Sequence, residues 1–145
     1  MLKIPRLRQP NSVTCLPTCV RAVLAHHGRH VSEEEALEMC GTRSAGTVAD
    51  LAVQGLTDSG IDFAFRQFSG LQELDELVRG DEPVIAFLWH PSGTAHAVVV
   101  CDIGSETITV MDPAIGDYLE LPIDHFETAW CDLQNEGMVI GIAQD

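Results

Sequence analysis

A cysteine, a histidine and an aspartate occur in this 145-residue chain in settings where their side chains could act together on a carbonyl group. Cys15 opens a run typical of a helix that ends near His27, and the start of a helix stabilises a thiolate. His96 lies in the apolar run Ala95–Cys101, and Asp112 begins an Asp-Pro pair. We therefore predict Cys15 as a nucleophile, His96 as its base and Asp112 as the carboxylate that orients the base.

A fourth residue could bind the oxyanion that such a reaction produces. Gln9 stands six residues before Cys15, and its side-chain amide is a neutral N–H donor of the kind that a tetrahedral oxyanion requires. Asn11 is the nearest alternative donor. The residues alone leave the choice between these two amides open.

The other histidines and cysteines have plainer interpretations. His26, His27 and His30 lie at the far end of the Cys15 helix, about 16–18 Å from Cys15 at 1.5 Å per residue, so they cannot act as its base. The remaining cysteines are expected to be small buried hydrophobic residues, and they are Cys19, Cys40, Cys101 and Cys131. A metal site formed by Cys15, Cys19 and His26 or His27 is an alternative, although the chain lacks a second cysteine pair at structural-zinc spacing.

Hydrophobic periodicity and turn residues predict an α+β fold in one domain, residues 1–145. Helices are expected over residues 15–27, 32–39, 47–57, 69–78 and 123–130, and strands over 61–68, 84–89, 95–101, 107–111, 118–121 and 138–143. A helical lobe (about 10–80) should pack on an antiparallel sheet lobe (about 81–145). The hairpin of 95–101 with 107–111 should bring Asp112 level with His96.

The net charge of −14 is unevenly distributed. Residues 1–32 contain five basic residues and no acidic ones, so positive charge near Cys15 is expected to favour its thiolate. All 22 acidic residues follow, and such an acidic surface argues against nucleic acid as a partner.

Apolar runs too short for a membrane span, and the lack of a signal-peptide core, predict a cytoplasmic protein. An odd number of cysteines at irregular spacings argues against a disulfide framework, and no cofactor or metal is expected.

The chain resembles the papain-like cysteine peptidases of the bacteriocin-processing group, as a stand-alone domain. The resemblance is carried by Gln9, Cys15, Cys19, Val23–Gly28, His96–Val100 and Asp112–Gly116, and it extends over nearly the whole chain. It implies a papain-like fold, with Gln9 as oxyanion donor, Cys15 as nucleophile, His96 as base and Asp112 as orienting residue. The family commonly has glycine after the nucleophile, whereas this chain has Leu16, which could reshape the cleft.

The resemblance also implies a peptide substrate that is cut after a double glycine, at the end of a leader peptide. Members of the group are often joined to an exporter; none is attached here, so association with an exporter stays open. Two alternatives remain beside hydrolysis: a leader-peptide-binding domain without turnover, and a transglutaminase-like acyltransferase that passes the acyl group to an amine.

Overall fold

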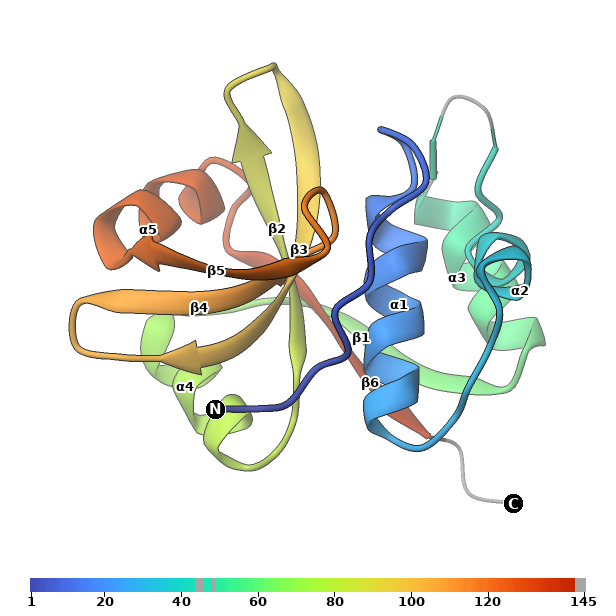
Figure 1. Cartoon of the computed structure of the whole chain (residues 1–145), viewed down its shortest axis with the longest axis horizontal. Coiled ribbons are helices and arrows are strands. Elements are labelled where there is room, and N and C mark those ends of the chain that lie inside the picture. The colour runs from blue at the N-terminus through green and yellow to red at the C-terminus, as the bar shows by residue number, and fades with distance from the viewer. Residues whose placement is uncertain (44–45, 48, 143–145) are drawn as a thin grey trace.

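The computed structural model describes residues 1–43, 46–47 and 49–142, and it confirms the α+β prediction (Figure 1). Its helices are α1 (Cys15–His26), α2 (Glu33–Met39), α3 (Ala49–Asp58), α4 (Leu71–Arg79) and α5 (Ile123–Cys131). Its strands are β1 (Ile61–Gln67), β2 (Val84–His90), β3 (Thr94–Ile103), β4 (Thr107–Asp112), β5 (Asp117–Pro122) and β6 (Glu136–Ile142).

The strands form one antiparallel sheet in the order β1-β6-β2-β3-β4-β5. The nearly continuous apolar runs of β2 and β3 occupy central positions, because a strand that is covered on both faces needs apolar side chains on both. The edge strand β5 is mostly exposed. The strand β6, last in the chain, lies between β1 and β2, so the edge strand β1 joins the sheet only through it.

Helices cover both faces of the sheet. α1 packs on β3 and β6, and α2 and α3 complete the layer on that face, to the right of the sheet in Figure 1. α4 and α5 pack on the opposite face around Phe126 and Trp130. β1 and α4 both precede residue 80, so the helix-rich part of the chain also supplies an edge strand and part of the second helical layer.

Local capping explains where α2 begins. Ser32 forms a capping box, because its hydroxyl accepts the Glu35 N–H while the Glu35 carboxylate accepts the Ser32 N–H. The helix predicted from residue 69 begins two residues later: Gly70 is the N-cap of α4, and Ser69 donates its N–H and hydroxyl to Glu73. The predicted start of α3 at Thr47 and the predicted last residue of β6, Ala143, involve positions 48 and 143, which lie outside the described residues.

Candidate active site

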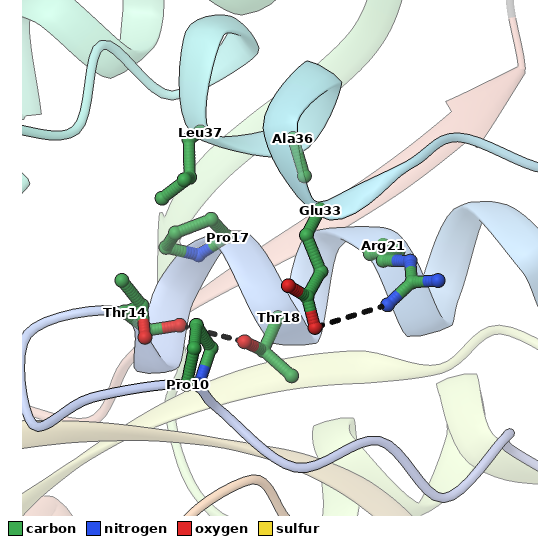
Figure 2. Close-up of a pocket in the computed structure, with 8 residues that line it drawn as sticks. All are labelled: Pro10, Thr14, Pro17, Thr18, Arg21, Glu33, Ala36 and Leu37. Carbon is green, nitrogen blue, oxygen red and sulfur yellow. Dashed lines mark hydrogen bonds and ion pairs between the residues drawn. The ribbon is translucent and has the colours of Figure 1, made fainter.

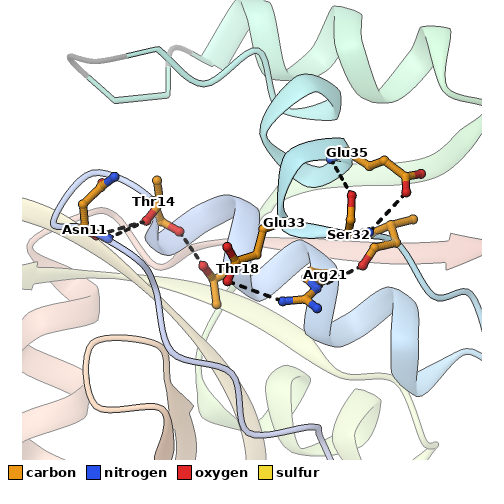
Figure 3. A network of polar contacts seen from close by, with 8 residues as sticks. Asn11, Thr14, Thr18, Arg21, Ser32, Glu33 and Glu35 are labelled. Atoms are coloured by element: carbon orange, nitrogen blue, oxygen red, sulfur yellow. Dashed lines mark hydrogen bonds and ion pairs between the residues drawn. The ribbon is translucent and has the colours of Figure 1, made fainter.

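Cys15 is the first residue of α1, and no side chain caps the helix before it. Thr14 occupies the N-cap position, where a threonine hydroxyl usually accepts a first-turn N–H. Here the Thr14 hydroxyl turns back and donates to the Asn11 carbonyl oxygen at 3.0 Å (Figure 3). The backbone N–H groups of Cys15 and Leu16 are therefore left free of a side-chain cap and can bind a thiolate or an oxyanion.

Packing on two sides fixes the direction of α1. One side of the helix contributes buried residues to the core against the sheet, namely Cys19, Val20, Val23 and Leu24. On its other side α2 lies close, and the crevice between them holds about 10 Å³, roughly the space of one water molecule (Figure 2). Arg21 bridges the two helices, with Nη1 at 3.8 Å from Glu33 Oε1 and Nε donating to the Val31 carbonyl oxygen.

His96 and Asp112 lie on neighbouring strands and contact each other directly, as the hairpin register predicted. His96 is the third residue of β3 and Asp112 is the last residue of β4. The distance between His96 Nε2 and Asp112 Oδ1 is 2.7 Å, and the Ala114 N–H also donates to Asp112 Oδ1 at 2.9 Å. Asp112 therefore fixes the plane of the imidazole and leaves its other nitrogen, Nδ1, to face Cys15.

Cys15 lies within hydrogen-bonding reach of His96, and this contact changes the acidity of the thiol. Burial alone would raise the pKa of Cys15, but hydrogen bonds from His96 and from the Ala97 N–H, together with the positive charge of His96, lower it below the ordinary value of 9.0. The Leu16 N–H at the start of α1 adds to this lowering.

The acidities of His96 and Asp112 shift in the complementary sense. Burial would lower the pKa of His96, but its bonds to Asp112 and Cys15 raise the pKa to about 9. Burial would raise the pKa of Asp112, and the bond from His96 lowers it. Together these shifts stabilise a thiolate–imidazolium pair beside a charged carboxylate.

The basic N-terminal segment is not among the largest causes of this effect. Those causes are His96 and the Ala97 and Leu16 N–H groups, and none of them is one of the five basic residues among residues 1–32. Arg6 pairs with Asp117 at 3.5 Å, and Arg21 pairs with Glu33. Close contacts with His96 and two backbone N–H groups act at much shorter range than the segment's net charge, so they account for most of the lowered pKa.

Gln9 reaches the site along the N-terminal segment but does not line the cleft. Its backbone N–H donates to the Pro113 carbonyl oxygen at 2.8 Å, directly after Asp112. Its side-chain Nε2 donates one hydrogen to the Asn11 carbonyl oxygen at 2.7 Å, which leaves the second hydrogen free. Gln9 Oε1 is buried without a partner among the described residues. The alternative donor, Asn11, uses its side-chain oxygen to accept the Val13 N–H.

The histidines at the end of α1 have other partners, as their distance along the helix predicted. His26 lies beside Asp81, with Nε2 at 3.2 Å from Oδ1. The ring of His27 is 2.9 Å from the Ile140 carbonyl oxygen, at the sheet. Both rings therefore make structural contacts at the far end of the helix, away from Cys15.

The five cysteines are all free, and their exposure divides them into three groups. Cys19, Cys40 and Cys101 are fully buried, as expected. Cys15 is half-buried at the cleft. Cys131 is exposed, which corrects the prediction that it is a core residue: it ends α5 and follows the buried Trp130, from which it is turned by about 100° around the helix.

A cleft of about 460 Å³ opens over Cys15 and His96. Its walls come from the N-terminal loop, the start of α1, the segment before α3 and the β2–β3 hairpin: Ser12–Val13, Cys15–Leu16, Gly46–Thr47, Phe87, Ser92 and Thr94–Ala97. Sequence reasoning missed most of these walls. One usable signal existed for Phe87, because pairing the two apolar runs as a hairpin places it opposite Ala97.

Among the described residues, no group of three or more His, Cys, Asp or Glu side chains is arranged to hold a metal ion. The alternative of a metal site at Cys15, Cys19 and His26 or His27 therefore has no geometric support. Within the same part of the chain, no helix is both long enough and apolar enough to cross a membrane.

Known structures resemble this one over nearly its whole length. The peptidase domain of Streptococcus ComA, a bifunctional ABC transporter involved in a quorum-sensing pathway, gives a TM-score of 0.77 at 18% identity, covering 98% of this chain and 99% of that one. A double-glycine-motif protease from an AMS/PCAT transporter, solved in complex with the leader peptide, gives 0.75 at 18% identity, covering 96% and 91%. These likenesses confirm the papain-like peptidase fold.

Sequence comparison gives the family. An uncharacterized protein of Methanothermobacter marburgensis is 32% identical over 110 residues, which cover 76% of this chain and 72% of that protein. The model of the peptidase C39 family matches residues 3–134, a span that contains the cysteine, the histidine and the aspartate of the site. With this match and the fold, the chain belongs to the peptidase C39 family.

Proposed function

We propose that this protein is a cysteine peptidase that hydrolyses a peptide bond after small residues, such as the double-glycine junction of a leader peptide. The observation that carries the proposal is the arrangement of Cys15, His96 and Asp112. A half-buried thiol with a lowered pKa faces an imidazole whose pKa is raised to about 9, and a carboxylate 2.7 Å away holds that imidazole. Family membership supports the reaction class.

In the first half of the proposed reaction, the Cys15 thiolate attacks the carbonyl carbon of the peptide bond. The carbonyl π electrons move to the oxygen, and the backbone N–H of Cys15 binds the resulting oxyanion. The second Nε2 hydrogen of Gln9 joins it when the Gln9 side chain, which does not line the cleft in this structure, turns toward Cys15. As the oxyanion re-forms the carbonyl, the C–N bond breaks and the leaving nitrogen takes a proton from His96. The products are a free amine and a thioester on Cys15.

In the second half, neutral His96 takes a proton from a water molecule, whose oxygen attacks the thioester carbonyl. The same donors bind the second oxyanion. Its collapse breaks the C–S bond, releases the carboxylic acid product and returns Cys15 as a thiolate beside protonated His96. Asp112 remains charged throughout, because it holds the imidazolium and takes no proton itself.

Small residues before the scissile bond suit the walls of the cleft. Leu16 projects from the first turn of α1 beside Cys15, and Phe87 and Ala97 contribute from the sheet. Side chains at Leu16 and Phe87 narrow the approach to the thiol, which favours glycine or alanine at that point of the substrate. The leader peptide bound to the AMS/PCAT protease supports a peptide ligand for this fold.

Two further parts of the proposal concern context. We place the protein in the cytoplasm, because five free cysteines suit a reducing compartment. We also treat residues 1–145 as one peptidase domain, since the family match, residues 3–134, includes the helices of both layers and strands β1 to β5 of the single sheet.

Cleavage of a defined peptide tests the proposal. A synthetic leader-type peptide with a Gly-Gly junction is incubated with the purified protein and with Cys15→Ala, and the products are identified by mass spectrometry. We expect a single cut after the second glycine by the wild type and none by the variant. A matched peptide with Val-Val at the junction should stay intact. Equal cleavage of both peptides, or cleavage by Cys15→Ala, would refute the assignment.

Alkylation separates the peptidase from the two alternatives. Iodoacetamide at pH 6 should label Cys15 quickly, and fragment spectra of the tryptic peptide spanning residues 9–21 distinguish it from Cys19. The exposed Cys131, which lies outside the cleft, is an internal control for labelling that depends on exposure alone. An inert Cys15 contradicts any acyl-transfer enzyme. A reactive Cys15 that binds the peptide without cutting it indicates a binding module, and products formed only when hydroxylamine is added indicate an acyltransferase.

A further inference from the structure

The turn after Asp112, residues 113–116, contacts two parts of the site at once. Its Ala114 N–H donates to the Asp112 carboxylate, and its Gly116 N–H donates to the Asp112 carbonyl oxygen at 2.8 Å. On its other side, the Pro113 carbonyl oxygen accepts the backbone N–H of Gln9 at 2.8 Å. The turn therefore connects Asp112, which orients His96, with Gln9, which lies six residues before the start of α1.

Gly116 allows the N-terminal segment to approach this turn very closely. Its φ is +65°, a left-handed conformation that favours glycine. A Cβ atom at this position would lie 2.7 Å from Arg8 Cβ and 3.1 Å from Arg8 Cα, closer than side-chain carbons pack. The backbone of Arg8, directly before Gln9, thus occupies the space that any other residue at 116 would fill.

Contacts earlier in the segment fix its path but not the position of Gln9 itself. The Leu2 N–H donates to the Cys101 carbonyl oxygen, and the Tyr118 hydroxyl donates to the Ile4 carbonyl oxygen at 2.6 Å. In Figure 1 the segment then runs along α1 toward the start of that helix. The contacts of Arg8 and Gln9 with the turn fix the backbone of Gln9, from which its side-chain amide reaches the Asn11 carbonyl oxygen.

We propose that Gly116 is a positioning residue for the oxyanion donor: the absence of a side chain at 116 seats Arg8 against the turn and so places the Gln9 amide beside the start of α1. The inference rests on the proposed function and adds to it, because it assigns a role to a residue that touches neither substrate nor Cys15. It also links Gln9 and Asp112 through one turn, so that the oxyanion donor and the base are aligned together.

A methyl group at Gly116 should displace the donor and leave the nucleophile intact. To reach an ordinary contact distance, Arg8 would have to move by close to 1 Å, and a misplacement of about 1 Å can lower a rate roughly 100-fold. Removal of one oxyanion donor costs about 100- to 1,000-fold in kcat, which sets the upper limit of the effect. Alkylation of Cys15 by iodoacetamide forms no oxyanion, so its rate should not change.

The test compares Gly116→Ala with Gly60→Ala. Gly60 also has a left-handed φ, +71°, but nothing lies within 4 Å of a Cβ there, so this control carries the backbone strain without the displacement. We expect kcat/KM for the Gly-Gly peptide to fall roughly 10- to 100-fold in Gly116→Ala and to stay near wild type in Gly60→Ala. The iodoacetamide rate of Cys15 should stay within about twofold of wild type in both variants.

The double variant Gln9→Ala/Gly116→Ala shows whether the effect passes through Gln9. We expect it to be no slower than Gln9→Ala alone, because the amide that Gly116 positions is already absent. Losses that multiply would overturn the proposal. An equal fall in alkylation and hydrolysis would overturn it too, since that pattern shows the turn acting through Asp112 and His96.

Two further measurements keep the inference testable whatever the first variant does. If Gly116→Ala does not fold, Arg8→Gly in the same chain removes the Cβ at 2.7 Å and so relieves the displacement. A folded double variant whose activity returns toward that of the wild type supports the proposal, whereas one that stays as slow as Gln9→Ala overturns it. If the wild type cuts no peptide, the probe is acetyl-glycyl-glycinal, whose aldehyde carbon the Cys15 thiolate attacks while the π electrons move to oxygen. Weaker binding of this aldehyde to Gly116→Ala than to Gly60→Ala supports the inference even where the proposed function fails, and equal binding contradicts it.

Discussion

Cys15 and Cys19 lie one turn apart on the same helix, yet their thiols have opposite properties. The pKa of Cys15 is lowered, whereas burial raises the pKa of Cys19 well above its ordinary value. Ala97, the residue after His96 on β3, contacts both. Its N–H donates to the Cys15 sulfur, and its carbonyl oxygen accepts from the Cys19 thiol at 3.4 Å. The Ala97 N–H, as a donor, favours the thiolate of Cys15, whereas the Ala97 carbonyl oxygen, as an acceptor, favours the protonated thiol of Cys19.

The comparison shows that position on the helix matters more than the helix itself. In the first turn, Cys15 has access to uncapped N–H groups, to the His96 ring and to the cleft. One turn later, Cys19 is fully buried among aliphatic side chains and faces an acceptor in place of a donor. A thiol becomes a nucleophile where donors and a cation converge on it, and it stays inert where burial dominates.

The largest expected effect on activity comes from removing the Cys15 thiol. Cys15→Ala should lower kcat on the order of a million-fold, as loss of the nucleophile does in a catalytic triad, with a melting temperature near that of the wild type. Cys19→Ala is the matched substitution. It removes a buried thiol and its bond to Ala97, so it should cost about 1–2 kcal/mol of stability and leave kcat within a few-fold. Comparable activity loss in both variants would contradict the distinction between the two thiols.

His96→Ala should be almost as severe, because Cys15 then loses both the cation that stabilises its thiolate and the acid that protonates the leaving amine. His27→Ala is the control. Its ring is also half-buried and also contacts a backbone carbonyl, but it lies at the far end of α1. Steady-state kinetics should show His27→Ala near wild type, with only a modest fall in melting temperature. Residual turnover in His96→Ala that matches His27→Ala would exclude His96 as the base.

These two tests address the part of the site that the sequence predicts well. Cys15 could be recognised because a helix start is a local pattern, and Asp112 could be placed because hairpin register follows from alternation along two adjacent strands. The largest cause of the lowered Cys15 pKa, its contact with His96, involves a residue that the sequence analysis paired with Cys15. The second cause could not be predicted, because it is the Ala97 N–H, 82 positions along the chain. The position of Gly46–Thr47 in the cleft wall could not be predicted either, because these residues are far along the chain from the other residues of the cleft.

The fold shows the same division between local and distant information. Helix and strand types follow from local periodicity, and the capping box of α2 was visible in four residues. The insertion of β6 between β1 and β2 was not, since strands far apart in sequence carry no mark of their neighbours. The exposure of Cys131 depends likewise on which side of α5 meets the sheet.

The activity of Asp112→Asn should lie between that of the Cys15 and His96 variants and that of the wild type, at roughly 100- to 10,000-fold below wild type. The substitution should also change the pH profile of the activity. The active pair needs protonated His96, so wild-type activity should decline as the pH rises through about 9. Without the carboxylate charge that helps to raise the His96 pKa, this decline should move to lower pH. Asp117→Asn, at the position paired with Asp112 on β5, should leave the profile unchanged. An unshifted alkaline limb in Asp112→Asn would contradict the role of Asp112.

The same ion pair predicts how stability depends on pH. The His96 pKa is raised on folding from 6.5 to about 9, so the stabilisation from protonated His96 is complete below about pH 6.5 and is lost as the pH rises through about 9. The Asp112 pKa is lowered, so its contribution is present above 3.8 and is lost as the pH falls through the lower folded value. Urea unfolding at pH 7 and pH 10 should therefore show the wild type losing more stability than Asp112→Asn over that interval.

The smallest expected effect concerns specificity at the cleft. Leu16 is half-buried beside Cys15, and Leu16→Ala should enlarge the space next to the scissile bond. We expect the ratio of kcat/KM for a peptide with Val before the cut to that for glycine to rise about tenfold, in line with the 1–3 kcal/mol that one methylene contributes in an apolar pocket. Leu37→Ala, which trims an equally half-buried leucine in the crevice on the far side of α1 (Figure 2), should leave the ratio unchanged. An equal change in both variants would mean that Leu16 acts through the stability of α1, whereas a change in Leu16→Ala alone identifies it as the residue that restricts what Cys15 can reach.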